Sequence, residues 1–313
     1  MKSTKKTLIA LAITAAMGMS GAANAGVLAS TTFSITNFLL SNSVTGTTLA
    51  LSDFNTLVAT NNGGDAASLT GAGSAGNTFN LPITNPATDL LRACVGACGS
   101  APAENNFVVL APPPSAQFVN GDQQLIGTAI NLGGGTTGAN ARLRSDVSLT
   151  GTGIGSANAD VGLNSSFIFS LTSNVTIGVN FDGTISLVSF TDAGTAFPGN
   201  AQTSTALSVL LTRADNGATV FNFNNAASAT GNCNEGLNRT LNRNAPFNGL
   251  SSYSCSGHFS AVTPTLLAGT AYQLSIRQNV NADASLIPEP GVLSMLGLGL
   301  LGMGAALRKR KSA

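Results

Sequence analysis

Residues 167–187 read FIFSLTSNVTIGVNFDGTISL, with large apolar residues at every second position over most of the stretch. Such alternation is typical of β-strands that bury one face and expose the other. The pattern predicts strands at 167–171 and 175–181. Asp182-Gly183 predicts a tight hairpin turn, with Ile185 and Leu187 on the return strand.

The same period of two recurs towards the C-terminus. Residues 207–211 and 272–276 alternate, and Asp215-Asn216-Gly217 predicts a turn into a strand at 220–223. Six or more strands joined by Gly- and Asn-rich turns indicate an all-β fold, either a β-sandwich or a jelly roll.

The pattern is weaker before residue 112. Residues 33–40 and 49–58 predict strands or one short helix, and the Gly/Asn/Ala-rich residues 60–78 predict a loop. The three prolines at 112–114 are stiff and form either an interdomain linker or a loop within one sandwich. We expect one domain, because the first part has few large apolar residues for a core of its own.

Both ends of the chain carry targeting signals. Residues 1–25 have the order of a secretory signal peptide, which predicts cleavage by signal peptidase. Three lysines (Lys2, Lys5, Lys6) precede an apolar run at 7–17, and Ala23-Asn24-Ala25 is a small-x-small cleavage site.

The C-terminus has three parts. Pro288, Glu289 and Pro290 precede the uncharged run 291–307, and a basic cluster follows: Arg308, Lys309, Arg310 and Lys311. A helix over 291–307 would be about 26 Å long, close to the ~30 Å of a bilayer core. The basic cluster is typical of a cytoplasmic flank.

This arrangement resembles the PEP-CTERM sorting signal of proteins that Gram-negative bacteria export. The resemblance covers residues 288–313 and implies a membrane helix at 291–307, transient anchoring in the inner membrane and processing by an exosortase. It implies that Pro288, Glu289 and Pro290 are the recognition element, and that the mature protein lies at the cell surface or outside the cell.

Between these signals lies an ectodomain, residues 26–287, of unusual composition. Only 9% of the whole chain is charged, and the ectodomain has seven Arg, no Lys and twelve acidic residues, a formal net charge of −5. This composition excludes a coiled coil and disfavours nucleic acid as a partner. The surface must depend on Asn, Ser, Thr and Gly for solubility, which fits a polysaccharide-rich exterior.

Four cysteines lie in the ectodomain: Cys94, Cys98, Cys233 and Cys255. An even number in an oxidising compartment favours disulfides, and three pairings exist. The local pairing, Cys94 with Cys98 and Cys233 with Cys255, is our prediction. The alternative is a zinc site formed by cysteines and His258.

The sequence predicts no catalytic residue, metal site or cofactor. His258 is the single histidine and no G-x-S-x-G motif in a strand–turn–helix context accompanies it. The acidic residues lie mostly in turns, although a calcium site at Asp53, Asp65 or Asp122 is an alternative. We therefore expect a structural surface or matrix protein that supports biofilm or aggregate formation. A glycan-binding module is the second hypothesis and an exported hydrolase the third.

Overall fold

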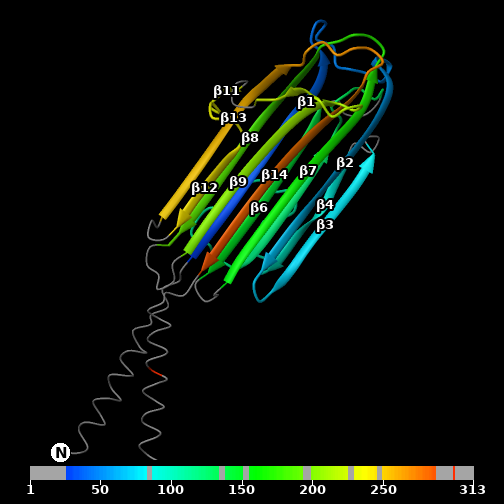
Figure 1. Ribbon diagram of the computed structural model, residues 1–313. Helices are drawn as coiled ribbons and strands as arrows, with labels where there is room; N and C mark the ends of the chain where they lie inside the picture. Colours follow the sequence, from blue (N-terminus) through cyan, green and yellow to red (C-terminus); the bar gives the residue numbers. More distant parts are fainter. Residues whose placement is uncertain are drawn as a thin grey trace, which may run out of the picture.

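The computed structural model describes residues 26–82, 87–133, 138–150, 155–192, 199–224, 229–244, 249–286 and Gly299. These residues form two antiparallel sheets with a single short 3₁₀ turn at Leu51–Asp53 among the strands. The all-β fold is therefore confirmed, and the two sheets pack face to face as a sandwich (Figure 1).

Seven strands make up the first sheet. Their spatial order is β11 (Ala229–Gly231), β13 (Gly249–Val262), β8 (Ile177–Thr191), β1 (Gly26–Asn42), β6 (Ala139–Thr150), β5 (Phe118–Ile126) and β4 (Ala87–Gly96).

The second sheet also has seven strands. Their order is β10 (Thr219–Asn222), β9 (Gly199–Arg213), β14 (Ala271–Leu286), β7 (Gly155–Leu171), β2 (Phe54–Leu69) and β3 (Gly73–Pro82), and β12 (Arg239–Asn244) pairs with the other half of the outer edge of β9.

The strands are long and run along the long axis of the molecule (Figure 1). β14 has 16 residues, which at ~3.4 Å per residue is about 50 Å. β1 begins and β14 ends at the same end of the sandwich, because Val27 and Leu286 both pack beside Gly199. We call this the tail end and the opposite end the far end.

Two apolar clusters fill the interior. The far-end cluster contains the large aromatic residues, including the stack of Phe38, Phe181 and Phe259 with ring centroids 5.5 and 5.2 Å apart. The tail-end cluster is lined by small residues, among them Ala29, Ala159 and Ala282. Because protein interiors leave few voids, the alanines indicate that the sheets approach each other more closely at the tail end.

Several sequence-based predictions hold. Residues 207–211 lie in β9, the turn at 215–217 leads into β10, and 272–276 lie in β14. Residues 33–40 lie in β1. The predicted element at 49–58 is a strand only in part, because residues 51–53 form the 3₁₀ turn and 54–58 open β2.

The predicted loop at residues 60–78 is wrong. Most of this stretch belongs to β2 and β3, which pair from Thr60–Pro82 to Leu69–Gly73. Its glycines are needed for packing: a Cβ on Gly63 would lie 2.6 Å from the carbonyl oxygen of Gly162 and 2.8 Å from the Phe79 ring. Small residues here allow close approach rather than a turn.

The predicted hairpin at Asp182-Gly183 is also wrong. β8 continues through both residues and pairs on both sides, with β1 and with β13. Gly183 lies under buried side chains: an added Cβ would be 2.7 Å from Leu237 Cδ1 and 3.0 Å from Phe259 Cε2. The glycine therefore makes room for the core and does not turn the chain.

The prolines at 112–114 lie in the connection between β4 and β5, which are neighbouring strands of the first sheet. Strands from before and after this connection pair with each other in both sheets: β1 pairs with β6 and β8, β4 with β5, and β2 with β7.

We predict that Gly183→Ala destabilises the sandwich by about 1–3 kcal/mol, because the new methyl group overpacks a fully buried site. The free energy of unfolding from urea titration measures the effect. Gly99→Ala is the matched control, since no atom lies within 4 Å of a Cβ at that position. Equal stabilities of the two variants would contradict this account of Gly183.

Candidate functional site

The junction between the sandwich and the C-terminal segment lies at the end of β14. Leu286 pairs with Gly155 of β7 and Gly199 of β9, and it is buried. The predicted recognition residues Pro288, Glu289 and Pro290 and the basic residues 308–311 lie outside the described residues. No helix among the described residues is long and apolar enough to cross a membrane, and the predicted helix at 291–307 also lies outside them, apart from Gly299.

The four cysteines form two disulfides, Cys94–Cys98 and Cys233–Cys255, as the local pairing predicts. The second bridge ties β13 to the segment after β11, and both of its cysteines are buried. Cys255 is therefore not available as a zinc ligand beside His258.

His258 instead pairs with an acidic residue across the first sheet. It lies opposite Asp182 in the β13–β8 pairing, and its Nδ1 is 2.9 Å from Asp182 Oδ1. Asn37 Nδ2 donates to the other carboxylate oxygen at 3.4 Å. Both members of the pair are about half exposed, so this is a contact at the surface of the sheet.

A buried charged cluster on the outer face of the first sheet was not predicted. Residues 97–117, which we call the covering segment, lie over β1, β5 and β6. Beneath them Arg144 and Asp146 form an ion pair with exposed fractions of 1% and 0%. Asp146 also accepts hydrogen bonds from Ser30 Oγ at 2.6 Å and Asn120 Nδ2 at 3.3 Å.

Side chains from the sheet hold the covering segment in place. Asp122 Oδ2 accepts from the backbone N–H of Asn105 at 2.7 Å, and Ser30 Oγ accepts from that of Leu110 at 2.9 Å. Arg144 donates to the carbonyl of Asn106, and Ser148 to that of Ala116. The segment starts at the Cys94–Cys98 bridge, so its path is fixed at several points.

The charges of this cluster do not balance. Burial raises the pKa of Asp122 to about 6; the N–H of Asn105 opposes the rise, and the carboxylates of Glu104 and Asp89 add to it. Burial also raises the pKa of Asp146, and the positive charge of Arg144 only partly opposes this rise. Asp122 Oδ1 and Arg144 Nη2 have no hydrogen-bond partner among the described atoms, which is a cost for buried groups.

The acidic residues proposed for calcium do not come together. Asp53 caps the 3₁₀ turn by accepting from the N–H of Ala50 at 2.8 Å. Asp65 lies inside the sandwich and accepts from the N–H groups of Asn77 and Ala93, whereas Asp122 lies on the outer face of the first sheet. Burial raises the pKa of Asp65 as well. Among the described residues, no group of three or more metal-binding side chains occurs.

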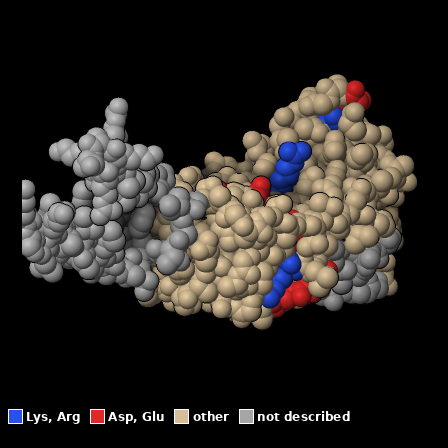
Figure 2. Space-filling view, turned by 90° about the horizontal axis from the view of Figure 1, so that it is seen from below, with Lys and Arg blue, Asp and Glu red and all other residues tan. Residues whose placement is uncertain are grey.

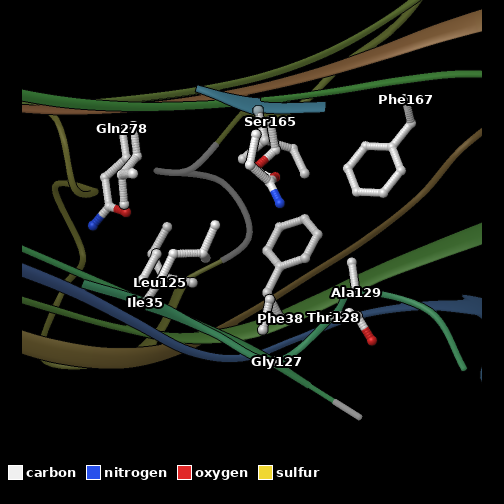
Figure 3. A pocket seen from close by; sticks show the side chains of 14 residues that line it. Ile35, Phe38, Leu125, Gly127, Thr128, Ala129, Ser165, Phe167 and Gln278 are labelled. Atoms are coloured by element: carbon white, nitrogen blue, oxygen red, sulfur yellow. Dashed lines mark hydrogen bonds between the residues drawn. The ribbon is translucent and has the colours of Figure 1, made fainter. Parts of the chain in front are cut away.

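A small cavity lies between the sheets near the far end. Phe38, Phe167 and Leu125 surround it together with the polar Ser165 and Gln278 (Figure 3). The cavity volume is about 40 Å³, enough for water molecules but well below the ~150 Å³ of a cavity that binds benzene. It is therefore too small for a sugar ring or a similar ligand.

The outer face of the second sheet carries a polar trough. Its floor is Gly64 and Gly162, which pair across β2 and β7. On one side Asn279 Nδ2 donates to Asp160 Oδ1 at 2.7 Å, and on the other side lie Asn77 and Thr78 of β2's partner β3. The trough thus combines the Asp160 carboxylate, the Asn279 amide and the Thr78 hydroxyl around a floor without side chains.

Charged residues are sparse on the molecular surface. Figure 2 shows a face on which uncharged residues dominate and the few basic atoms lie close to acidic ones. Two ion pairs at the surface of the described residues are Arg213 with Asp215 and Arg239 with Glu235. A surface of this kind has no basic stripe that could track a phosphate backbone.

The comparisons with known proteins bear on the C-terminal segment. Residues 286–311 match the family model of the PEP-CTERM protein-sorting motif. The chain therefore carries this sorting motif, which implies an exported protein that an exosortase-type machinery processes. No curated protein matches the chain.

Among solved structures, the subviral particle of infectious bursal disease virus VP2 aligns with 91% of this chain and 88% of that chain. The identity is 10% and the TM-score 0.08, so the alignment carries no argument about fold or function.

We predict that Asp122→Asn flattens the dependence of stability on pH. The folded state favours the protonated carboxyl, so this group's contribution is complete below about pH 3.8 and is lost as pH rises to about 6. The loss is on the order of 2 kcal/mol, and the variant should not show it. Urea unfolding at pH 4 and pH 7 measures it, with exposed Asp215→Asn as control. Parallel curves for wild type and Asp122→Asn would contradict the prediction.

Proposed function

We propose that the sandwich is a non-catalytic structural component of the cell surface or extracellular matrix, where it supports biofilm or aggregate formation. On the proposed route, signal peptidase removes residues 1–25, residues 291–307 anchor the chain transiently in the inner membrane, and processing near Pro288, Glu289 and Pro290 releases it.

One observation carries this proposal: the described strands end at Leu286, before the Pro288-Glu289-Pro290 element of the sorting motif. β14 has its partners on both sides up to Leu286, so removal of the residues after Ile287 takes away none of the described strands. Similarly, β1 begins at Gly26, directly after the predicted signal-peptide site, and Gly26 already pairs with Thr150. Both proposed processing events therefore fall outside the described strands.

The surface supports a role outside the cell. Along the outer face of the second sheet, Asn, Ser, Thr and Gln alternate with the buried apolar residues of β14, β7 and β9. These uncharged groups can form hydrogen bonds with water or with hydroxyl-rich polymers. Because they carry no charge, the net charge of the surface stays low. Such a surface is suited to a polysaccharide matrix.

We expect deletion of residues 288–313 to change both the location and the mature size of the protein. The wild type should pass through a membrane-bound precursor and yield a product that ends near residue 288, whereas the deletion variant should never be membrane-bound. Cell fractionation with intact mass spectrometry distinguishes them. The fold should survive in both, since β14 is intact. An unchanged location and size would refute the sorting role.

The polar trough favours glycan binding as a second candidate function. A carboxylate accepts and an amide donates hydrogen bonds to sugar hydroxyls, and the glycine floor allows a ring to approach the backbone. The low charge of the site fits a neutral saccharide better than a charged one.

We predict that neutral glycans bind the purified sandwich on a glycan array, and that Asp160→Ala weakens binding about tenfold by removing a charge-assisted acceptor. Asp215→Ala, an equal change of charge in an exposed turn, is the control and should bind like wild type. Absence of binding to any neutral glycan would exclude this candidate and leave the purely structural role.

A further inference from the structure

The sorting motif begins inside the fold rather than after it. The matched segment starts at Leu286, which is the last residue of β14 and is 3% exposed. Only Ile287 separates this buried residue from Pro288. Residues 287–290 span at most about 14 Å even when fully extended. The recognition residues are therefore tied closely to the end of the sandwich.

Ser285 and Leu286, which end the described part of β14, have no free backbone edge to offer. Enzymes and domains that recognise extended peptides form main-chain hydrogen bonds with them along a strand edge. Ser285 pairs with Ser156 on one side and Asn200 on the other, and Leu286 pairs with Gly155 and Gly199. β14 is also an inner strand of its sheet, so neighbouring strands flank its end on both sides.

The space beside the tail end is narrow during the anchored stage. With the apolar run starting at Gly291, five residues after Leu286, the membrane boundary lies within about 18 Å of Leu286. A single α-helix with its side chains is about 10–12 Å across. A processing enzyme that encloses Pro288, Glu289 and Pro290 between the membrane and a closed sandwich would have room for about one layer of structure.

We infer that processing requires the last rungs of β14, Ser285 and Leu286, to separate from β7 and β9. This inference rests on the proposed sorting function and concerns the regulation of that same site. Strand ends open locally at a fraction of the free energy of global unfolding. The folded body is thus a slower substrate than a chain in which these residues are free, and the packing of the tail end sets the rate.

Val27 is the residue outside the motif that tests this coupling. Val27 and Leu286 both pack beside Gly199: a Cβ added to Gly199 would lie 2.4 Å from Val27 Cγ2 and 3.6 Å from Leu286 Cδ2. Both residues belong to the tail-end cluster. Truncating Val27 loosens the packing around Leu286 while leaving residues 286–313 unchanged. Val179 has the same exposed fraction, 1%, but lies in the far-end cluster.

The experiment is a pulse–chase of the full chain in cells that contain the processing enzyme, with precursor and product separated by mass. One variant carries ten Gly/Ser residues after Ile287 followed by a second Leu-Ile, so that the motif keeps its own neighbours. A second carries the same insertion in the exposed turn at 215–217. The others are Val27→Ala and Val179→Ala.

We expect the insertion after Ile287 to speed processing on the order of tenfold, which corresponds to about 1.4 kcal/mol of strand opening. Val27→Ala should speed it severalfold, and Val179→Ala and the insertion at 215–217 should not. Processing that the insertion after Ile287 leaves unchanged or slows would overturn the inference. Loss of dependence on residues 288–313 would instead count against the proposed function, because it would show that the tail is not the sorting element.

Discussion

The structure depends on the pairing of one strand, β14, with two neighbours along its whole length. Its register with β7 and β9 is continuous from the far end to Leu286, with no bulge. Each such hydrogen bond contributes only about 0.5–1.5 kcal/mol net, but the ladder fixes which residues face inward over the full length of the second sheet. Without β14 that sheet would separate into β2, β3 and β7 on one side and β9, β10 and β12 on the other.

The interior is not uniformly apolar, and this shapes the molecule. Polar side chains such as Asp65, Gln123 and Gln278 lie between the aromatic far-end cluster and the alanine-rich tail-end cluster. Gln278 donates to the carbonyl of Phe33 in the opposite sheet at 3.1 Å. Such contacts fix the position of one sheet relative to the other, which apolar packing between small residues specifies weakly. On the outer face of the first sheet, polar contacts likewise fix the position of the covering segment, which encloses Arg144 and Asp146.

The sequence predicted the strands in which large apolar residues alternate with polar ones. It failed where small residues have a packing role. Phe167, Phe169 and Leu171 are recognisable because one face is apolar. Gly183 was assigned to a turn because Asp-Gly favours turns locally, whereas its real constraint is Leu237, 54 residues away. The glycines of β2 gave the same false signal. Glycine is permissive in both settings, so the local sequence does not distinguish them.

The buried charged cluster was not predictable for a different reason. Along β6 the polar residues Arg144, Asp146 and Ser148 alternate with Leu143, Ser145, Val147 and Leu149, of which all but Ser145 are apolar, and this is the pattern of a strand with one face in water. A strand whose polar face is covered by another segment of the chain has the same sequence pattern as a strand whose polar face is in water. The available signal was the long connection after Cys98, with its prolines and its disulfide, since a segment of that length must lie over some surface. The disulfides, by contrast, followed from spacing and compartment.

On the proposed route, the position of β14 as the last described strand would also order the events of export. Its partners β7 and β9 precede it in sequence, and a sheet dominated by pairings distant in sequence forms slowly. The second sheet can close only after residues 271–286 have passed through the membrane. At that moment the proposed anchor, residues 291–307, would still hold the chain at the membrane surface. If the last rungs must open for processing, a closed sheet keeps its tether longer than an unfinished one. The rungs that complete the fold would then also determine when the protein leaves the membrane.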